Sequence, residues 1–133
     1  MRHRKRTNKF GRFADHRNAL FINLSKSLIL HRRITTTVTK AKALKGFFEP
    51  LLTFAKSGSV ADRRRIAQDL VDRDLVKVLC DEIAPAVKDR NGGYLRIVKI
   101  GARKGDNAPM ALVEIIGARK EEVKEEKATA EKK

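Results

Sequence analysis

The chain contains 133 residues, with 31 Lys and Arg against 16 Asp and Glu, which gives a formal net charge of +15. A surplus of this size in one domain indicates a polyanionic partner, because the charges otherwise repel one another. No apolar run approaches the roughly 18 residues of a membrane span, and the single cysteine, Cys80, excludes an internal disulfide and a cysteine-rich zinc site.

The charge is polarised along the chain. Residues 1–33 hold ten basic residues against Asp15 alone, and residues 34–56 hold four against one. Residues 57–90 hold seven of each sign, and residues 91–117 hold four basic and two acidic residues. This distribution favours a defined anion-binding face, and the leading interpretation is a non-enzymatic RNA-binding protein.

Residues 1–14 show no helical or strand period and predict a basic extended arm that is disordered alone and orders on RNA. Its Lys and Arg would neutralise phosphates, so that affinity falls with salt. Phe10 and Phe13 lie between the charges, where they either stack on unpaired bases or pack on the domain, and packing is favoured beside a helix start. The alternative for the arm is a solvated tail.

The first helix is predicted to begin at Asp15, which either caps it itself or follows a capping turn. Apolar residues then recur at the spacing of one helix face: Leu20, Phe21, Leu24 and Leu28. The helix should end near residues 31–33, where cations suit the negative end of its dipole.

Residues 34–38 are all β-branched and predict a short strand. Thr39 is then expected to cap a second helix that closes at residues 57–59. Pro50 lies inside this helix and predicts a kink or break near residues 46–50. Its apolar face is expected at Leu44, Phe47, Phe48, Leu51 and Ala55.

Two more helices are expected before residue 90. Ser59 with Asp62 three residues later is typical of a helix start, and Asp72 or Asp74 would open the fourth helix. Pro85 lies late in that fourth helix. The apolar positions are Val60, Ile66 and Leu70 in the third helix and Leu75, Val76, Leu79, Ile83 and Val87 in the fourth.

Residues 90–93 predict a turn, and residues 94–100 and 110–116 predict a β-hairpin joined by the loop 101–109. Gly101 and Gly105 bracket two cations in that loop, Arg103 and Lys104. Close backbone approach at the glycines would let these cations bind a phosphate, and the alternative is an ordinary polar loop.

The expected fold is α/β in class: a single compact α+β domain with the order α-β-α-α-α-β-β. A small mixed or antiparallel three-stranded sheet is expected to pack on the helices. The basic arm covers residues 1–14, the globular domain residues 15–117, and a charged, flexible tail residues 118–133.

No catalytic or metal site is expected. His3, His16 and His31 lie in or beside the basic segment, where an imidazole would hydrogen-bond phosphate. The acidic residues of the middle are interleaved with Arg73 and Lys77 at helical spacing, which favours ion pairs over Mg²⁺ binding: Asp69, Asp72, Asp74, Asp81 and Glu82. Cys80 is expected to be a small buried hydrophobe.

The order and spacing of many short motifs resemble the bacterial large-subunit ribosomal protein seventeen family over nearly all of residues 1–116. The motifs are Met1-Arg2-His3-Arg4, Phe10-Gly11-Arg12, His16-Arg17, Asn23-Leu24, Thr36-Thr37, Lys40-Ala41-Lys42, Pro50-Leu51-Leu52-Thr53, Ala55-Lys56, Gly92-Gly93-Tyr94, Arg96-Ile97 and residues 101–111.

The resemblance implies a structural component of the large ribosomal subunit that binds ribosomal RNA beside other large-subunit proteins, on the nascent-chain exit side. It implies no enzyme activity, cofactor, small-molecule substrate or membrane partner. Because the motif begins at Met1, no transit peptide is expected, and the expected location is the bacterial cytoplasm, in the ribosome. The expected RNA contacts are Arg2, His3, Arg4, Lys5, Arg6, Asn8, Lys9, Arg12, His16, Arg17, Arg32, Lys40, Lys42, Arg96, Lys99, Arg103 and Lys104.

Two other classes compete with this interpretation. A small DNA-binding regulator would use residues 15–33 as a recognition helix, with Arg17, Asn18 and Lys26 free to contact bases. A nuclease would use His16 beside Asp15, and its activity would be lost in His16→Ala with binding retained.

Overall fold

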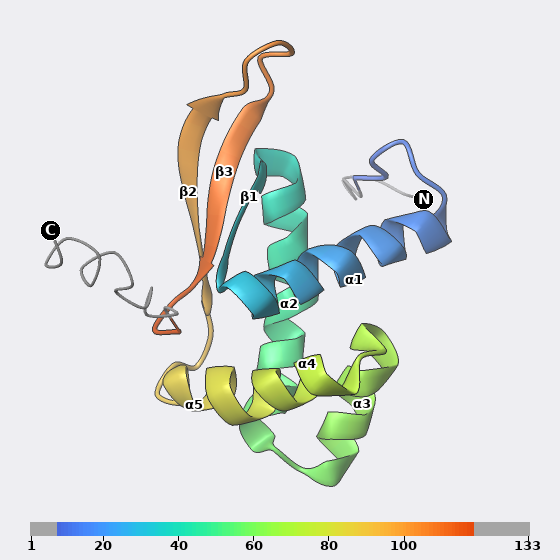
Figure 1. Cartoon of the computed structure of the whole chain (residues 1–133), viewed down its shortest axis with the longest axis vertical. Coiled ribbons are helices and arrows are strands. Elements are labelled where there is room, and N and C mark those ends of the chain that lie inside the picture. Colours follow the sequence, from blue (N-terminus) through green and yellow to red (C-terminus); the bar gives the residue numbers. More distant parts are fainter. Residues whose placement is uncertain (1–7, 119–133) are drawn as a thin grey trace, which may run out of the picture.

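The computed structural model describes residues 8–118, shown in Figure 1. Their order confirms the predicted α-β-α-α-α-β-β succession, because α4, a π-helical turn η1 and α5 form one continuous helix. The elements are α1 (Ala14–His31), β1 (Arg33–Thr37), α2 (Val38–Ser57), α3 (Val60–Leu70), α4 (Arg73–Val78), η1 (Leu79–Ile83), α5 (Ala84–Ala86), β2 (Leu95–Ala102) and β3 (Pro109–Ile115).

The sheet is antiparallel throughout, with the strand order β1-β3-β2, so β3 is central. Val113 of β3 lies opposite Ile34 of β1 on one side and Ile97 of β2 on the other. Side chains alternate along β3, and those that point to the helices are buried, including Ala111 and Val113. Helices α1 and α2 therefore cover one face of the sheet, as Figure 1 shows.

Helix α2 forms the centre of the core, and its predicted apolar face is confirmed. Leu44, Phe48, Leu51 and Ala55 are buried, and Phe47 is partly buried against them. A kink or a break was expected near Pro50, and the break is wrong, because α2 is continuous from Val38 to Ser57. A proline inside a helix costs about 3 kcal/mol, whereas each buried large side chain contributes roughly 1.5–3 kcal/mol. Packing on several sides of α2 therefore outweighs the proline.

The predicted caps of the later helices are confirmed, whereas neither Asp15 nor Thr39 caps its helix. The Ser59 hydroxyl accepts from the Asp62 amide, and the Asp72 carboxylate accepts from the amides of Asp74 and Leu75. Helices α1 and α2 begin one or two residues earlier than expected, after Phe13 and Thr37, and neither of those residues caps through its side chain. Asp15 and Thr39 therefore lie inside their helices, in the first turn.

The apolar face of the fourth predicted helix is confirmed, with all five positions from Leu75 to Val87 buried. The π turn η1 lies in the middle of this face, and the Ala84 amide bonds to the Leu79 carbonyl five residues back. The wider turn accommodates Pro85, which lies two residues after η1 and has no amide to donate. In α3, Ile66 and Leu70 are buried as expected, but Val60 is 67% exposed because it begins the helix and points to solvent.

The predicted hairpin is confirmed, with a shorter loop than expected, residues 103–108. A bulge between Lys99 and Gly101 interrupts the register of β2 against β3. Ala118, which the sequence assigned to the tail, is buried. None of the helices within residues 8–118 is both long enough and apolar enough to cross a membrane.

Candidate nucleic-acid interface

Three basic segments that are distant in sequence lie at the same end of the molecule. Thr37, which precedes α2, pairs with Met110 of the hairpin, and Met110 pairs with Gly101 on the other side, so the start of α2 lies beside the hairpin. Figure 1 shows the N-terminal segment at this end as well, with α3, α4 and α5 at the other end. We call this the basic end, and it comprises Lys9, Arg12, Arg17, Lys40, Lys42, Lys99, Arg103 and Lys104.

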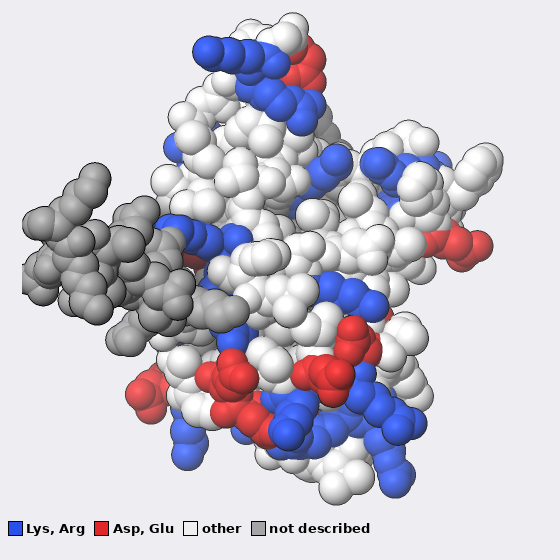
Figure 2. Space-filling model, in the orientation of Figure 1, with Lys and Arg blue, Asp and Glu red and all other residues white. Residues whose placement is uncertain are grey.

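The charges at the opposite end of the molecule are mixed. Figure 2 shows Lys and Arg interleaved with Asp and Glu over α3, α4 and α5. Arg63 of α3 contacts Asp81 of η1 at 2.6 Å, and Arg32 contacts Glu82 at 2.5 Å. The prediction that the acidic residues form ion pairs holds for Asp81 and Glu82, but the partners come from other elements instead of Arg73 and Lys77. Helical spacing identifies neighbours on one helix only, whereas packing brings α3 and the end of α1 to η1.

Residues 9–12 form a turn where extended chain was expected. The Arg12 amide donates to the Lys9 carbonyl at 3.1 Å, and Phe10 and Gly11 between them both have positive φ, 55° and 60°. The Phe10 ring packs edge-on against Phe21 with centroids 5.7 Å apart. This end of the arm is thus attached to α1 through Phe10. The rest of the arm, with Arg2, His3, Arg4, Lys5 and Arg6, lies outside the described residues.

Phe13 differs from Phe10 in its environment. Its side chain is 91% exposed, next to the half-buried Arg12 and Arg17. The Arg17 guanidinium donates to the Arg12 carbonyl at 3.4 Å, and Arg12 itself donates to the Phe10 carbonyl at 3.5 Å. Asn8, Lys9 and His16 are exposed around this cluster. The segment therefore presents one open aromatic ring among several cations.

Arg32, which the sequence assigned to RNA binding, lies away from the basic end, at the junction of α1 and β1. Its side chain is 9% exposed and donates to the Ile29 carbonyl at 2.7 Å and to Glu82 at 2.5 Å. Its backbone has a φ of 63° and ends α1, with its amide donating to the Leu28 carbonyl. The left-handed turn directs the guanidinium into the molecule, where it donates to the Ile29 carbonyl at the helix end.

The first turn of α2 contributes Lys40 and Lys42 to the basic end. Lys42 is exposed and Lys40 half-buried, and this turn contains no acidic residue and no side-chain cap. The free amides and the partial positive charge at the start of a helix both attract anions. The two lysines therefore add to a positive potential that is already present there.

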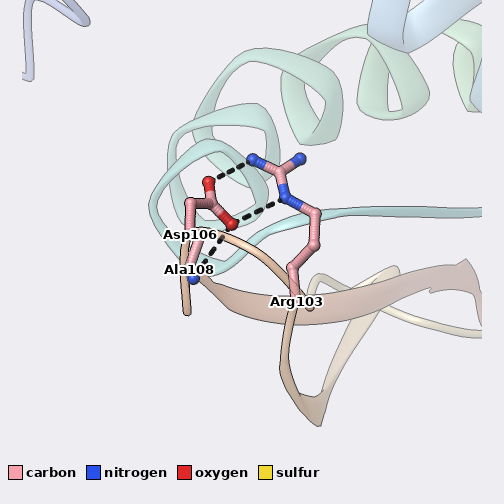
Figure 3. Close-up of polar contacts among 3 residues, drawn as sticks. All are labelled: Arg103, Asp106 and Ala108. Carbon is pink, nitrogen blue, oxygen red and sulfur yellow. Dashed lines mark hydrogen bonds and ion pairs between the residues drawn. The ribbon is translucent and has the colours of Figure 1, made fainter.

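The hairpin presents fewer free cations than its sequence indicated. Arg96 contacts Glu114 at 3.2 Å on the neighbouring strand. Arg103 makes two bonds to Asp106, from Nε at 3.1 Å and from Nη2 at 2.7 Å, shown in Figure 3. These bonds and the Ala108 amide lower the pKa of Asp106 to about 2. Lys99 and Lys104 are exposed. Asp106 was not among the residues predicted from the sequence, although an acid three residues after Arg103 in a glycine-containing loop indicates such a pair.

The described residues offer no arrangement typical of catalysis. His16 and His31 are exposed, and residues 8–118 contain no cluster of His, Cys, Asp and Glu that could hold a metal ion. Cys80 is buried as predicted, and burial raises the pKa of its thiol, with Arg63 opposing that rise.

Comparison with known proteins identifies related sequences. The family described as Ribosomal protein L17 matches residues 20–116. Large ribosomal subunit protein bL17 of Thermus thermophilus is 51% identical over 117 residues, covering 87% of this chain and 99% of the relative. The protein of the same name in Bacteroides thetaiotaomicron is 48% identical over 128 residues, covering 96% and 78%. That of Amoebophilus asiaticus is 51% identical over 116 residues, and this chain spans 60% of its length.

Proposed function

The chain belongs to the ribosomal protein L17 family, and from that premise we propose that it binds ribosomal RNA through its basic end as a structural constituent of the large subunit. It is a structural protein and not an enzyme, as the family implies. In this role it stabilises the folded RNA during and after subunit assembly, within cytoplasmic ribosomes.

The observation that carries the proposal is the separation of charge between the two ends of the domain. Eight cations of the N-terminal segment, the start of α2 and the hairpin lie at one end in separate groups, with Asp15 and Asp106 among them, whereas α3, α4 and α5 carry balanced, partly paired charges (Figure 2). Stability alone does not require this arrangement, because exposed like charges repel. A surface that contacts successive phosphates from three elements fits a folded RNA, whose strands cross at short distances.

The structure favours this proposal over a DNA-binding regulator. A recognition helix carries its cations on an outward face, whereas α1 packs against α2 and β1 and ends in the inward-turned Arg32. Arg17, one of the residues expected to contact bases, donates to the Arg12 carbonyl. The cations are spread over three segments instead of following one helix.

The remaining parts of the proposal follow from the family resemblance. Arg2, His3, Arg4, Lys5 and Arg6 extend the RNA contact beyond the described residues. Other large-subunit proteins adjoin the domain on the nascent-chain exit side, and the balanced end of the molecule is the part of its surface that the RNA contact leaves available to them.

Sedimentation of tagged variants tests the proposal. A double variant, Lys42→Glu with Lys104→Glu, reverses two charges of the basic end, and Lys77→Glu with Lys88→Glu makes the same change of net charge at the balanced end. The first variant should leave the large subunits after a moderate salt wash, and the second should remain bound. Equal retention of both, or a free pool of the wild type, would refute RNA binding through the basic end.

A further inference from the structure

The tip of the β2–β3 hairpin is an ordered loop stabilised by its own polar groups. The Arg103 amide donates to the Ala108 carbonyl at 2.9 Å, and the Asn107 amide donates to the Arg103 carbonyl at 3.0 Å. Gly105 has a φ of 101° and Asn107 a φ of 54°, so the chain turns through two left-handed positions. In Figure 1 this tip extends beyond the helices at the basic end, away from the hydrophobic core.

Asp106 links the backbone of this loop to the side chain of Arg103. One of its carboxylate oxygens, Oδ1, accepts from both the Ala108 amide and Arg103 Nε, and Oδ2 accepts from Arg103 Nη2. Figure 3 shows the edge of the guanidinium turned to the carboxylate, while its third nitrogen, Nη1, points away from Asp106. The carboxylate therefore fixes the rotamer of Arg103 and leaves the outer part of the guanidinium open.

From this geometry we propose that Asp106 is a positioning residue for RNA, which orients Arg103 beside Lys104 so that both contact the phosphodiester backbone. The inference rests on the proposed function and deepens it. An exposed ion pair contributes little to stability, and both side chains of this pair are 53% exposed. A long arginine side chain that is already held in place loses less freedom when it binds a phosphate, which favours binding.

A positioning role of Asp106 and a purely electrostatic effect of its charge predict opposite changes in RNA binding. A carboxylate beside phosphates repels them, so that removing Asp106 adds one net positive charge and should strengthen binding if only the charge mattered. If Asp106 positions Arg103, its removal weakens binding in spite of the added charge. Asp106→Asn tests this difference, because asparagine keeps the size and an acceptor for the Ala108 amide but loses the ionic pair.

The experiment measures the Kd of the full-length protein for deproteinised large-subunit ribosomal RNA of the same organism. Asp106→Asn should weaken binding about two- to tenfold, the scale expected for ordering one arginine side chain. Asp89→Asn is the matched control, since it removes an exposed acid from the balanced end with the same change of net charge. This control should bind at least as tightly as the wild type.

The double variant Arg103→Ala with Asp106→Asn separates positioning from other effects. Arg103→Ala alone should weaken binding, and adding Asp106→Asn should weaken it no further, because Asp106 acts through Arg103. Unfolding temperatures should stay unchanged, which a purely structural role for Asp106 would not allow.

The outcomes distinguish the inference from the proposed function. If Asp106→Asn binds as tightly as Asp89→Asn, or if Arg103→Ala has no effect, the positioning role is overturned while RNA binding by the rest of the basic end stands. If the wild type fails to bind the RNA, the proposed function fails first.

Discussion

The guanidinium of Arg32 contacts the carboxylate of Glu82, 50 residues later in the chain, at 2.5 Å. The same guanidinium donates to the Ile29 carbonyl at 2.7 Å, near the end of α1. The Arg32 side chain thus donates to the end of α1 and attaches the junction between α1 and β1 to η1. Because Arg32 is buried and Glu82 is 61% exposed, replacing the arginine should lower the free energy of unfolding more than replacing its partner.

Arg32→Ala is expected to lower the free energy of unfolding by about 2–3 kcal/mol, because it removes a buried, charge-assisted hydrogen-bond donor and its packing. Glu82→Gln should cost less, about 1 kcal/mol, because the exposed partner is screened by solvent. Urea unfolding of both variants measures the difference, with Lys77→Ala as an exposed control. A loss in Arg32→Ala no larger than in the control would show that the junction is held by other contacts.

Gly117→Ala should destabilise the domain by about 2 kcal/mol. A Cβ at this position would lie 2.8 Å from the Ala86 carbonyl oxygen, and the backbone φ of +84° is unfavourable for any residue with a side chain. Gly92→Ala is the control, since nothing lies within 4 Å of its Cβ position. Thermal unfolding should separate the two variants, and similar midpoints would contradict the close approach of Gly117 to α5.

The two phenylalanines of the N-terminal segment should behave differently when replaced. Phe10→Ala removes the edge-on contact with Phe21 and should lower stability by about 1 kcal/mol. Phe13 is 91% exposed, so Phe13→Ala should leave stability unchanged. We expect it to weaken RNA binding, since an exposed ring among cations can stack on a base. Unchanged affinity in Phe13→Ala would assign no stacking role to this ring.

Deleting residues 2–7 removes Arg2, Arg4, Lys5 and Arg6 but keeps the turn around Phe10. The salt dependence of RNA binding should become shallower, because fewer counterions are released, and incorporation into large subunits should fall. The helical circular dichroism should persist, since α1 begins at Ala14. A variant that keeps residues 2–7 in shuffled order has the charge of the wild type and is the control for the loss of charge. Normal assembly of the deletion variant would remove the arm from the proposed interface.

The Arg103–Asp106 pair should persist to unusually low pH. Because the pKa of Asp106 falls from 3.8 to about 2, the paired form gains stability above pH 3.8 and loses it as the pH falls through about 2. A carboxyl-carbon NMR titration of Asp106 should therefore have its midpoint near 2, and the Ala108 amide signal should shift in the same range. A midpoint close to 3.8 would show that the pair does not form in solution.

Local patterns predicted the elements well, because their causes are local. The apolar face of α2 follows from its helical period. The Ser59 and Asp72 side chains cap their helices by accepting from amides only two or three residues later in the chain. The features that these local patterns did not predict depend on residues that are distant in sequence or on competing interactions. The buried pair of Arg32 with Glu82 was not predicted, because Glu82 lies 50 residues later in the chain.

The hairpin shows the same limit on a smaller scale. Arg103 was expected as a cation of the loop, but its pairing with Asp106, which occupies one edge of the guanidinium, was not predicted. Pro50 was expected to kink or break α2, but the helix continues through it, because the packing around the helix outweighs the local preference for a break. Site residues were thus predictable as charges along the chain, and their orientation required the tertiary structure.

The central position of β3 has a consequence for the order of folding. Within the described domain β3 is the last strand to be synthesised, yet it provides the backbone partners of both β1 and β2. The helices form from nearby residues, whereas the pairing of β1 with β3 closes a long loop and carries a larger entropic cost. A nascent chain that stops before Pro109 therefore contains two strands with no partner between them, and the sheet forms in one late step when β3 inserts.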